Sequence, residues 1–577
     1  MDNPIQNFLK AAEKEEDEFR SFFAKDEAGI VLRSIINEFD WFHYNFTKQE
    51  TRTTEQAEQY YILRLGMTRA IYLAFNSRSS YKFPVVMFER NKELSLTALE
   101  IAAGLGMIEH GRRIAHSTKT GQCEISQVDD ANFEFTLPSF LPNESHHEEA
   151  MSEYYRSETR KIFAKEQEKI LTDKISKSIE TLLDELVYVF REKYIGYAAD
   201  PLLDDYFFGL AYHEIHLQDG FDTFHYSTKF GGIEYQKYIL STVFFSSWSM
   251  KHLNFCEALV KKAPQIRMEN ILTISADRSE LVQSLAYGLN SFGSTFEGFT
   301  QTSIEEADRI IDVISLSRDN IEMAARPVAP IPYLIQPSKT GLIKLLAGAS
   351  SEPIHFLLHS LRHHFPKEYD KHQRQREGPF RRAVEKTLKG AFENLEFRNN
   401  IKVKQGGKTL TDIDLVVIDK SMGALILCQL KYQDLYGGDI LAASSRHTRL
   451  REETERWLDT IEDWQDKIGE QELRATLRLP KNFSIKSVYQ LVLSKHYAYP
   501  LKDIVKGESA AYANWLQFMN AVELMKITQG TIRTTPGLVK LLQKQNLEAK
   551  TIEHMSEPDT LYSIGEFKFS VRQTEPS

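Results

Sequence analysis

The sequence predicts a multidomain protein whose N-terminal two-thirds are mainly α-helical and are followed by an α/β domain with a mixed central sheet. Three observations support this prediction. A chain of 577 residues is too long for one ordinary core and corresponds to about three or four domains. Apolar residues recur at three- and four-residue spacings up to residue 325, which is typical of helices. Between Thr411 and Gln433, two apolar stretches flank a turn that ends on glycine, which is typical of a β-hairpin.

The composition is that of a globular chain, and it excludes several classes of function. Hydrophobic residues make up 42% of the chain and charged residues 26%. The three cysteines lie far apart without Cys-x-x-Cys spacing, so we expect neither a disulfide framework nor a structural zinc site. We find no export signal and no apolar run of membrane-spanning length, which predicts a cytoplasmic location. A Gly-rich phosphate loop and a G-x-S-x-G elbow are also missing, which disfavours an NTPase or a serine hydrolase.

Breaks in the helical pattern divide the chain into five predicted parts. Pro138 and Pro142 mark a boundary near residue 145, and four prolines between Pro327 and Pro337 mark a connector because proline interrupts helices. The parts are a helical domain over 1–145, a helical and aromatic-rich domain over 146–326, a proline-rich connector over 327–340, the α/β domain over 341–505 and a C-terminal helical extension over 506–577.

Two segments of the helical parts allow more specific structural predictions. A helix over 94–109 precedes two short expected strands, at 112–115 and 133–137. This order leaves a small winged-helix-like element as one alternative for the first domain. Glu- and Lys-rich sequence over 148–191 predicts one or two long helices.

In the α/β domain, the pattern predicts alternating helices and short strands. Leu450, Trp457, Ile461 and Trp464 form a helical stripe that should lie on the sheet. The expected elements are a helix over 376–392, a strand over 396–403, hairpin strands over 412–418 and 424–432, a helix over 441–468, a strand over 488–494 and closing helices over 508–527 and 536–545.

The hairpin carries polar residues among its apolar ones. Alternation along a strand should place Asp412 and Asp414 on one face, with Ile413 and Leu415 on the other. Gln429 and Lys431 should likewise project together from the second strand. Because an unpaired buried charge is costly, the expected partner of these groups is a divalent metal ion.

These residues resemble the motif of the PD-(D/E)XK, or restriction-endonuclease-like, nucleases. In that motif an Asp enters a strand, here Asp414 before Leu415-Val416-Val417, and Glu-x-Lys or Gln-x-Lys follows one hairpin later. The Gln form, here Gln429-Leu430-Lys431, resembles the Mrr-type restriction endonucleases. The resemblance covers residues 371–500 and implies a restriction-endonuclease-like fold with a Mg²⁺-dependent site, with Mn²⁺ as the alternative ion.

The resemblance also implies roles for individual residues. Asp414 and Gln429 would be metal ligands, and Lys431 would act on the attacking water or the phosphate. The preceding helix often supplies another acid in this superfamily, and the sequence offers both Glu377 and Glu385 as catalytic and metal-binding candidates. They stand eight residues apart, about 12 Å along a helix, so only one of them can reach the site.

A basic segment precedes the hairpin and is a candidate surface for phosphates. From Lys371 to Lys408, eleven lysines and arginines stand against four glutamates, a net charge of +7. Such a surface can hold a nucleic-acid backbone, although a solvated helix face has the same composition. The candidates for nucleic-acid contacts are Arg381, Arg382, Arg446 and Arg449.

Together these features predict a cytoplasmic Mg²⁺-dependent endonuclease that acts on DNA. A role in restriction or anti-phage defence is expected, because an uncontrolled nuclease would damage the genome of its own cell. The helical region would then recognise a target, a partner protein or a second copy of the chain. The alternative is a catalytically inactive protein of the same fold that binds nucleic acid or protein, since a fold does not fix a function.

Overall fold

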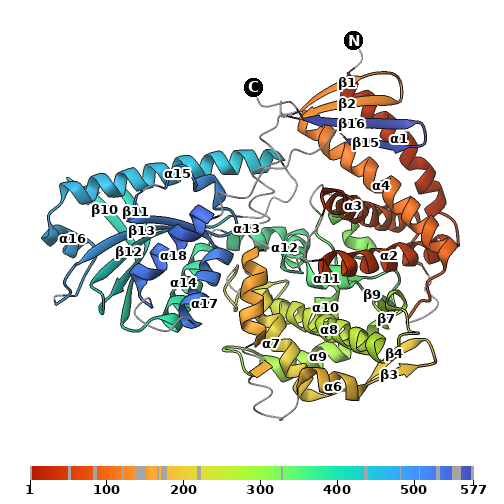
Figure 1. Cartoon of the computed structure of the whole chain (residues 1–577), viewed down its shortest axis with the longest axis horizontal. Coiled ribbons are helices and arrows are strands. Elements are labelled where there is room, and N and C mark those ends of the chain that lie inside the picture. Colours follow the sequence, from red (N-terminus) through yellow and green to blue (C-terminus); the bar gives the residue numbers. More distant parts are fainter. Residues whose placement is uncertain are drawn as a thin grey trace.

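The computed structural model places a helical region beside a domain built on a mixed sheet (Figure 1). The residues described are 3–49, 53–81, 87–118, 123–137, 151, 154–165, 168–169, 178–217, 223–325, 329–351, 353–373, 375–433, 440–480, 482–505, 507–527, 533–548 and 560–573.

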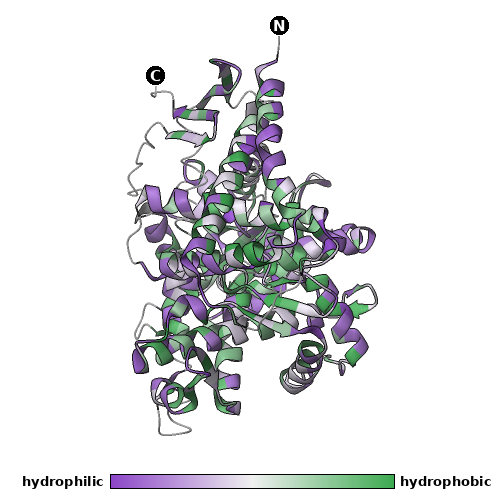
Figure 2. Cartoon of the chain, turned by 90° about the vertical axis from the view of Figure 1, so that its right-hand side faces the viewer, coloured by the Kyte–Doolittle hydropathy of each residue, from purple (hydrophilic) through white to green (hydrophobic). Residues whose placement is uncertain are grey.

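The helical region has one large core to which helices from both predicted helical domains contribute. Phe39 of α2, Ile239 of α8 and Ile310 of α10 belong to the same buried cluster. Figure 2 shows hydrophobic segments gathered in the middle of the molecule and hydrophilic ones at its periphery. The helices are α1 (Pro4–Phe23), α2 (Ala28–Lys48), α3 (Thr54–Ser77), α4 (Lys92–Thr118), α6 (Ile179–Leu186), α7 (Pro201–Leu217), α8 (Tyr235–Lys262), α9 (Arg278–Gly293), α10 (Ile304–Ile314), α11 (Leu346–Ser350), α12 (Pro353–His364) and α13 (Pro366–Gln373).

The proline-rich stretch is part of this core, so the prediction of a connector is wrong over the residues described. Ile331, Tyr333 and Leu334 are buried in the large cluster. Strand β8 (Leu334–Ile335) pairs with β9 (Gly341–Lys344), which pairs in turn with β7 (Ile274–Asp277). Prolines are tolerated here because Pro330 and Pro332 precede, and Pro337 follows, a short strand at the margin of a small sheet. Pro327 and the predicted boundary at residue 145 lie outside the described residues.

Part of the expected helix over 148–191 is strand instead. Helix α6 ends at Leu186, and β3 (Val187–Phe190) forms a hairpin with β4 (Tyr194–Tyr197). The run Val-Tyr-Val-Phe is β-branched and aromatic, which favours a strand over the helix that its acidic neighbours suggest. A second short hairpin joins β5 (Lys229–Phe230) to β6 (Ile233–Glu234).

The two ends of the chain meet in a four-stranded sheet. Its order is β1 (Glu124–Gln127), β2 (Asn132–Leu137), β16 (Phe567–Gln573) and β15 (Thr560–Ile564). Phe8 of α1 fills this sheet's core among the rings of four other phenylalanines. Figure 1 shows the C-terminal hairpin beside the N-terminal helix. The expectation that the C-terminal part is wholly helical is therefore wrong.

The same sheet bears on the prediction of a winged-helix-like element in the first domain. The strand expected over 133–137 is present as β2, but the one expected over 112–115 lies inside α4, which continues to Thr118. Buried Ile114 and Ala115 keep the helical spacing, so tertiary packing extends the helix. The hairpin β1–β2 is completed by strands from the other end of the chain rather than standing alone as a wing.

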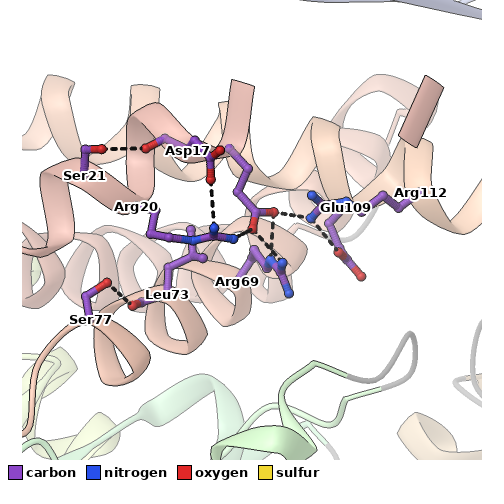
Figure 3. A network of polar contacts seen from close by, with 9 residues as sticks. Asp17, Arg20, Ser21, Arg69, Leu73, Ser77, Glu109 and Arg112 are labelled. Carbon is purple, nitrogen blue, oxygen red and sulfur yellow. Dashed lines mark hydrogen bonds and ion pairs between the residues drawn. The ribbon is translucent and has the colours of Figure 1, made fainter. Parts of the chain in front are cut away.

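A buried carboxylate ties α1 to α3 and α4. The Glu16 carboxylate is fully buried and accepts hydrogen bonds from Arg69 (2.7 Å to Nη2), Arg112 and Arg20. Figure 3 shows Arg69 and Arg112 converging on this point, with Glu109 beyond Arg112. Burial alone would raise the pKa of Glu16, but Arg69 and Arg112 outweigh it and hold the pKa below its usual value.

We expect Glu16→Gln to lower the free energy of unfolding by about 3 kcal/mol, because it leaves the partly buried Arg69 and Arg112 without their buried counter-charge. The stabilisation from the carboxylate should be present above its unfolded pKa and disappear as the pH falls through the folded pKa. Thermal unfolding monitored by circular dichroism measures the loss. Asp17→Asn is the control, since Asp17 is 57% exposed and pairs at the surface. Equal effects of the two changes would contradict the buried role.

The sheet domain has the predicted mixed sheet. Its order is β10 (Leu395–Gln405), β11 (Lys408–Asp419), β12 (Ala424–Lys431), β13 (Ser487–Ser494) and β14 (Ala510–Asn514). The first three strands are antiparallel, and β12, β13 and β14 are parallel. Helix α15 (Ile440–Lys467) covers one face, and α14 (Glu377–Ala391), α17 (Trp515–Ile527) and α18 (Thr535–Glu548) cover the other (Figure 1). Two short elements, α16 (Glu470–Thr476) and the 3-10 turn Tyr499–Leu501, lie in the connections.

Most predicted elements of this domain are confirmed. Helix α14 buries Phe380, Val384 and Leu388, and the α15 stripe is buried against the sheet. The expected helix over 508–527 begins only at Trp515, because residues 510–514 form β14. The predicted domain end at residue 505 therefore cuts the sheet. Alanine favours helices, but pairing with β13 and cover from α18 bury this segment as a strand.

Candidate active site

The candidate site lies where β11 and β12 separate. Their pairing runs from Asp419 opposite Ala424 to Leu415 opposite Cys428 and ends there. Just beyond it, the Asp414 Oδ2 atom accepts the backbone N–H of Leu430 at 2.7 Å. The Asp414 carboxylate therefore accepts a backbone N–H that a carbonyl of the neighbouring strand would accept if the pairing continued. This hydrogen bond fixes the Asp414 side chain between the two strands.

Asp414 also lies at a twist that the sequence did not predict. Ile413 packs into the core on the α15 side, whereas Leu415 packs into the core on the α14 side. The expectation that these two residues share a face is therefore wrong. The neighbouring strand reverses at the same level, since Phe397 packs on the α14 side and Ile401 on the α15 side. Asn400, between them, has a φ of 50°, a conformation that Asn tolerates better than most residues.

Gln429 and Lys431 project together toward α15, as predicted. The Gln429 Nε2 atom donates to Asp414 Oδ2 at 2.6 Å, and its side chain is buried. The Lys431 Nζ atom donates to Glu453 Oε2 at 2.9 Å. Lys431 is also close enough for its charge to lower the pKa of Asp414. The structure thus brings Asp414, Gln429 and Lys431 together.

The electrostatics of Asp414 favour an added cation. Burial raises its pKa to about 7, and the negative charges of Asp412 and Glu377 act in the same direction. The Leu430 N–H and the Lys431 ammonium act in the opposite direction but do not compensate. A positive charge bound beside Asp414 would relieve this repulsion.

The two candidate helix acids occupy different surroundings. Glu377 lies in the first turn of α14, is exposed, and its charge acts on Asp414. Glu385 lies two turns further along, with its Oε1 atom 3.9 Å from Arg381 Nε. Because its charge raises the pKa of Asp414, Glu377 is the helix acid that the electrostatics favour for a shared metal.

Glu453 is a site residue that the sequence analysis missed. It accepts from Lys431 on one oxygen and from Arg449 Nε on the other, at 2.7 Å. It follows Leu450 by three residues and precedes Trp457 by four, so it shares the side of α15 that faces the sheet. A search for polar residues along the apolar stripe would have found it.

The four candidate arginines surround the site unevenly. Arg381 donates from Nη1 to Asn400 Oδ1 at 3.0 Å, beside the twist that holds Asp414. Arg449 is 79% exposed beyond its bond to Glu453, and Arg446 lies one turn before it on α15. Arg382 is exposed on α14. Burial lowers the pKa of His225 in the helical region, and the charge of Arg382 acts in the same direction.

A second cation supports the strand end behind Lys431. Lys495 is buried, with Nζ 4.6 Å from the Phe380 ring centroid and 4.8 Å from that of Trp515. Its backbone N–H donates to the Lys431 carbonyl at 2.9 Å. Tyr432 lies between Lys495 and the guanidinium of Arg376, which is 4.3 Å from the Tyr432 ring centroid. These cation–π contacts hold Lys431 on a rigid base.

The same contacts connect the site with the helical region. Arg376 also lies over the rings of Phe224 and Tyr369, which belong to the large helical core. Trp515 donates from Nε1 to the carbonyl of His216 at the end of α7. The end of β12 therefore touches the helical region through packed aromatic and cationic side chains.

We compared the chain with known proteins and structures. No family model, curated protein or solved structure matches it. Within the described ranges, no group of three or more His, Cys, Asp or Glu side chains is placed to hold a metal ion, and no helix is long and apolar enough to cross a membrane. The resemblance to the PD-(D/E)XK nucleases thus rests on the residues themselves.

Proposed function

We propose that this protein is a metal-dependent nuclease that hydrolyses phosphodiester bonds of DNA. The observation that carries the proposal is the meeting of Asp414, Gln429 and Lys431 where β11 and β12 separate. Glu377 adds a second carboxylate whose charge reaches Asp414. This combination of two acids, an amide and an amine matches the motif that the sequence suggested.

The donor set suits Mg²⁺, with Mn²⁺ as the alternative. Mg²⁺ is commonly held by one or two carboxylates, with water and substrate oxygens completing its shell. Asp414, Glu377 and the Gln429 amide oxygen are the residues that would hold it. When bound, the ion would polarise a phosphoryl oxygen and make its bound water more acidic.

Lys431 and Glu453 supply the remaining chemistry from the protein itself. The Lys431 ammonium is half-buried beside Asp414, where it would stabilise negative charge developing on the phosphate. Glu453 positions that ammonium through its hydrogen bond. Arg381 and Arg449 lie on either side and would hold neighbouring phosphates.

The helical region would control this activity. Its core meets the strand that carries Lys431 through Arg376 and Tyr432, which offers a physical connection for target or partner recognition. We propose restriction or anti-phage defence as the setting. The partner would be another protein or a second copy of the chain.

A cleavage assay with the full chain tests the proposed function. Supercoiled plasmid, linear duplex, single-stranded DNA and RNA should each be incubated with the purified protein in Mg²⁺, in Mn²⁺ and in EDTA. We expect DNA cleavage with either ion and none in EDTA, and loss of cleavage in Asp414→Ala. Cleavage that persists in Asp414→Ala, or none with any substrate, would overturn the proposal.

The inactive binding protein remains the second candidate, and one observation favours it. The Gln429 amide donates to the same Asp414 oxygen that accepts from Leu430, so the protein itself occupies much of that carboxylate. Calorimetric titration of Mg²⁺ into the wild type and Asp414→Ala separates the two candidates. Heat that depends on Asp414 supports the nuclease, whereas DNA binding without any metal signal supports the binding protein.

A further inference from the structure

Strands β10 and β11 continue as a two-stranded ribbon beyond the rest of the sheet. The ribbon, residues 401–412, closes at Gln405 opposite Lys408. Its turn is Gly406-Gly407, with φ angles of 56° and 82°. Two positive φ angles are what a two-residue turn needs to follow the twist of a ribbon, and glycine supplies them without strain.

The register places this ribbon next to the candidate site. Leu415 pairs with Cys428, so Asp412 is level with Lys431, the last residue of β12. Residues before Asp412 therefore extend past the end of β12. Lys408 is four residues further out, about 13 Å at the usual rise of a strand. The base of the ribbon is held by Trp457 of α15, whose Nε1 donates to the Asp412 carbonyl at 2.8 Å.

The ribbon carries only positive charge beyond its base. Lys402, Lys404 and Lys408 are exposed, and no acidic residue lies between positions 401 and 411. Within the part of the chain that the structure describes, none of these three lysines forms an ion pair, although Asp412 is the cross-strand neighbour of Lys402. Ile401 and Val403 pack into the core on the α15 side, so Lys402 projects from the other face.

We propose that this ribbon holds double-stranded DNA, with its lysines on the backbone phosphates. The inference rests on the proposed nuclease function and narrows its substrate to duplex DNA. A two-stranded β-ribbon fits the major groove of B-form DNA, and lysines on such a ribbon reach the flanking phosphates. The major groove of A-form RNA is too narrow for it. A duplex bound on the ribbon would bring its backbone to Asp414, since the ribbon and Asp414 both lie near the end of β12.

The test compares two triple variants of the full chain that remove the same charge. Binding of a labelled duplex is followed by fluorescence anisotropy in EDTA over a series of NaCl concentrations. The ribbon variant replaces Lys402, Lys404 and Lys408 by glutamine. The control variant replaces three lysines by glutamine at the opposite ends of the strands, away from the ribbon. These are Lys420 in the β11–β12 turn, Lys467 at the end of α15 and Lys486 before β13.

We expect the ribbon variant to bind duplex DNA at least about tenfold more weakly at low salt. Each lost phosphate contact should also reduce the slope of log K against log salt by about 0.9. The control variant should bind like the wild type, and an RNA duplex of the same sequence should bind weakly to all three proteins. Unchanged melting temperatures confirm that both variants are folded.

Two outcomes would overturn the inference. Identical slopes for the ribbon and control variants would show that the lysines do not contact the backbone. RNA duplex bound as tightly as DNA, and through the same lysines, would show that no B-form groove is recognised. Because binding is measured without a metal, a protein that does not cleave still gives a clear result. Failure of the nuclease proposal is thus separate from failure of the ribbon inference.

Discussion

Lys431→Ala should slow DNA cleavage by about a hundredfold to a thousandfold while leaving duplex binding nearly intact. Removing one preorganised group that stabilises transition-state charge typically has an effect of this size. Lys431 lies beside Asp414 at the end of β12 and contacts Glu453, whereas the ribbon lysines lie further out. Loss of its amine should therefore affect the chemical step much more than the affinity. Single-turnover cleavage and anisotropy binding measure the two effects separately.

The controls for Lys431 use its neighbours and a remote lysine. Lys420→Ala, at the opposite end of the hairpin, should cleave like the wild type because Lys420 pairs with Glu396 at the surface, away from Asp414. Glu453→Gln should slow cleavage less than Lys431→Ala does, since the amide can still accept a hydrogen bond from the amine. Full activity of Lys431→Ala, in protein free of contaminating nuclease, would place the active site elsewhere.

The elements around the site were predictable because their sequences have strong local periodicity. The buried stripe of α15 repeats at helical spacing, and apolar runs fill the second half of β11 and most of β12 and β13. Strands buried on both faces have this composition, and turn residues separate them. The amino-acid sequence alone therefore places Asp414 on one strand of the hairpin and Gln429 and Lys431 at the end of the other.

What the sequence could not predict depends on contacts between distant segments. Residues 510–514 are rich in alanine and become a strand only because β13 offers an edge. The C-terminal hairpin gains its place from β2, more than four hundred residues away along the chain. The face reversal at Asp414 arises from a twist shared with Asn400 on the neighbouring strand, which alternation within one strand cannot reveal. Glu453 was not predicted as a site residue because its partner, Lys431, lies on a different element.

The last prediction concerns Asp414→Asn, for which activity and stability should change in opposite directions. The folded state raises the pKa of Asp414 from 3.8 to about 7, first through burial and then through Asp412 and Glu377. Between these values the folded protein keeps a proton that the unfolded chain releases, so stability should fall as the pH rises toward 7. A difference of one pKa unit between the folded and unfolded states corresponds to about 1.4 kcal/mol in the free energy of unfolding.

Asparagine removes that charge but keeps an oxygen that can accept the Leu430 N–H. Above pH 7 the variant should therefore be more stable than the wild type, by about 2 kcal/mol, and below about pH 4 the two should unfold alike. Cleavage should be lost, because a neutral amide does not supply the charge that holds Mg²⁺. Added Mg²⁺ should raise the melting temperature of the wild type and leave that of the variant unchanged. A variant that is less stable than the wild type at high pH would show that the Asp414 carboxylate is compensated without a metal, in favour of a structural role.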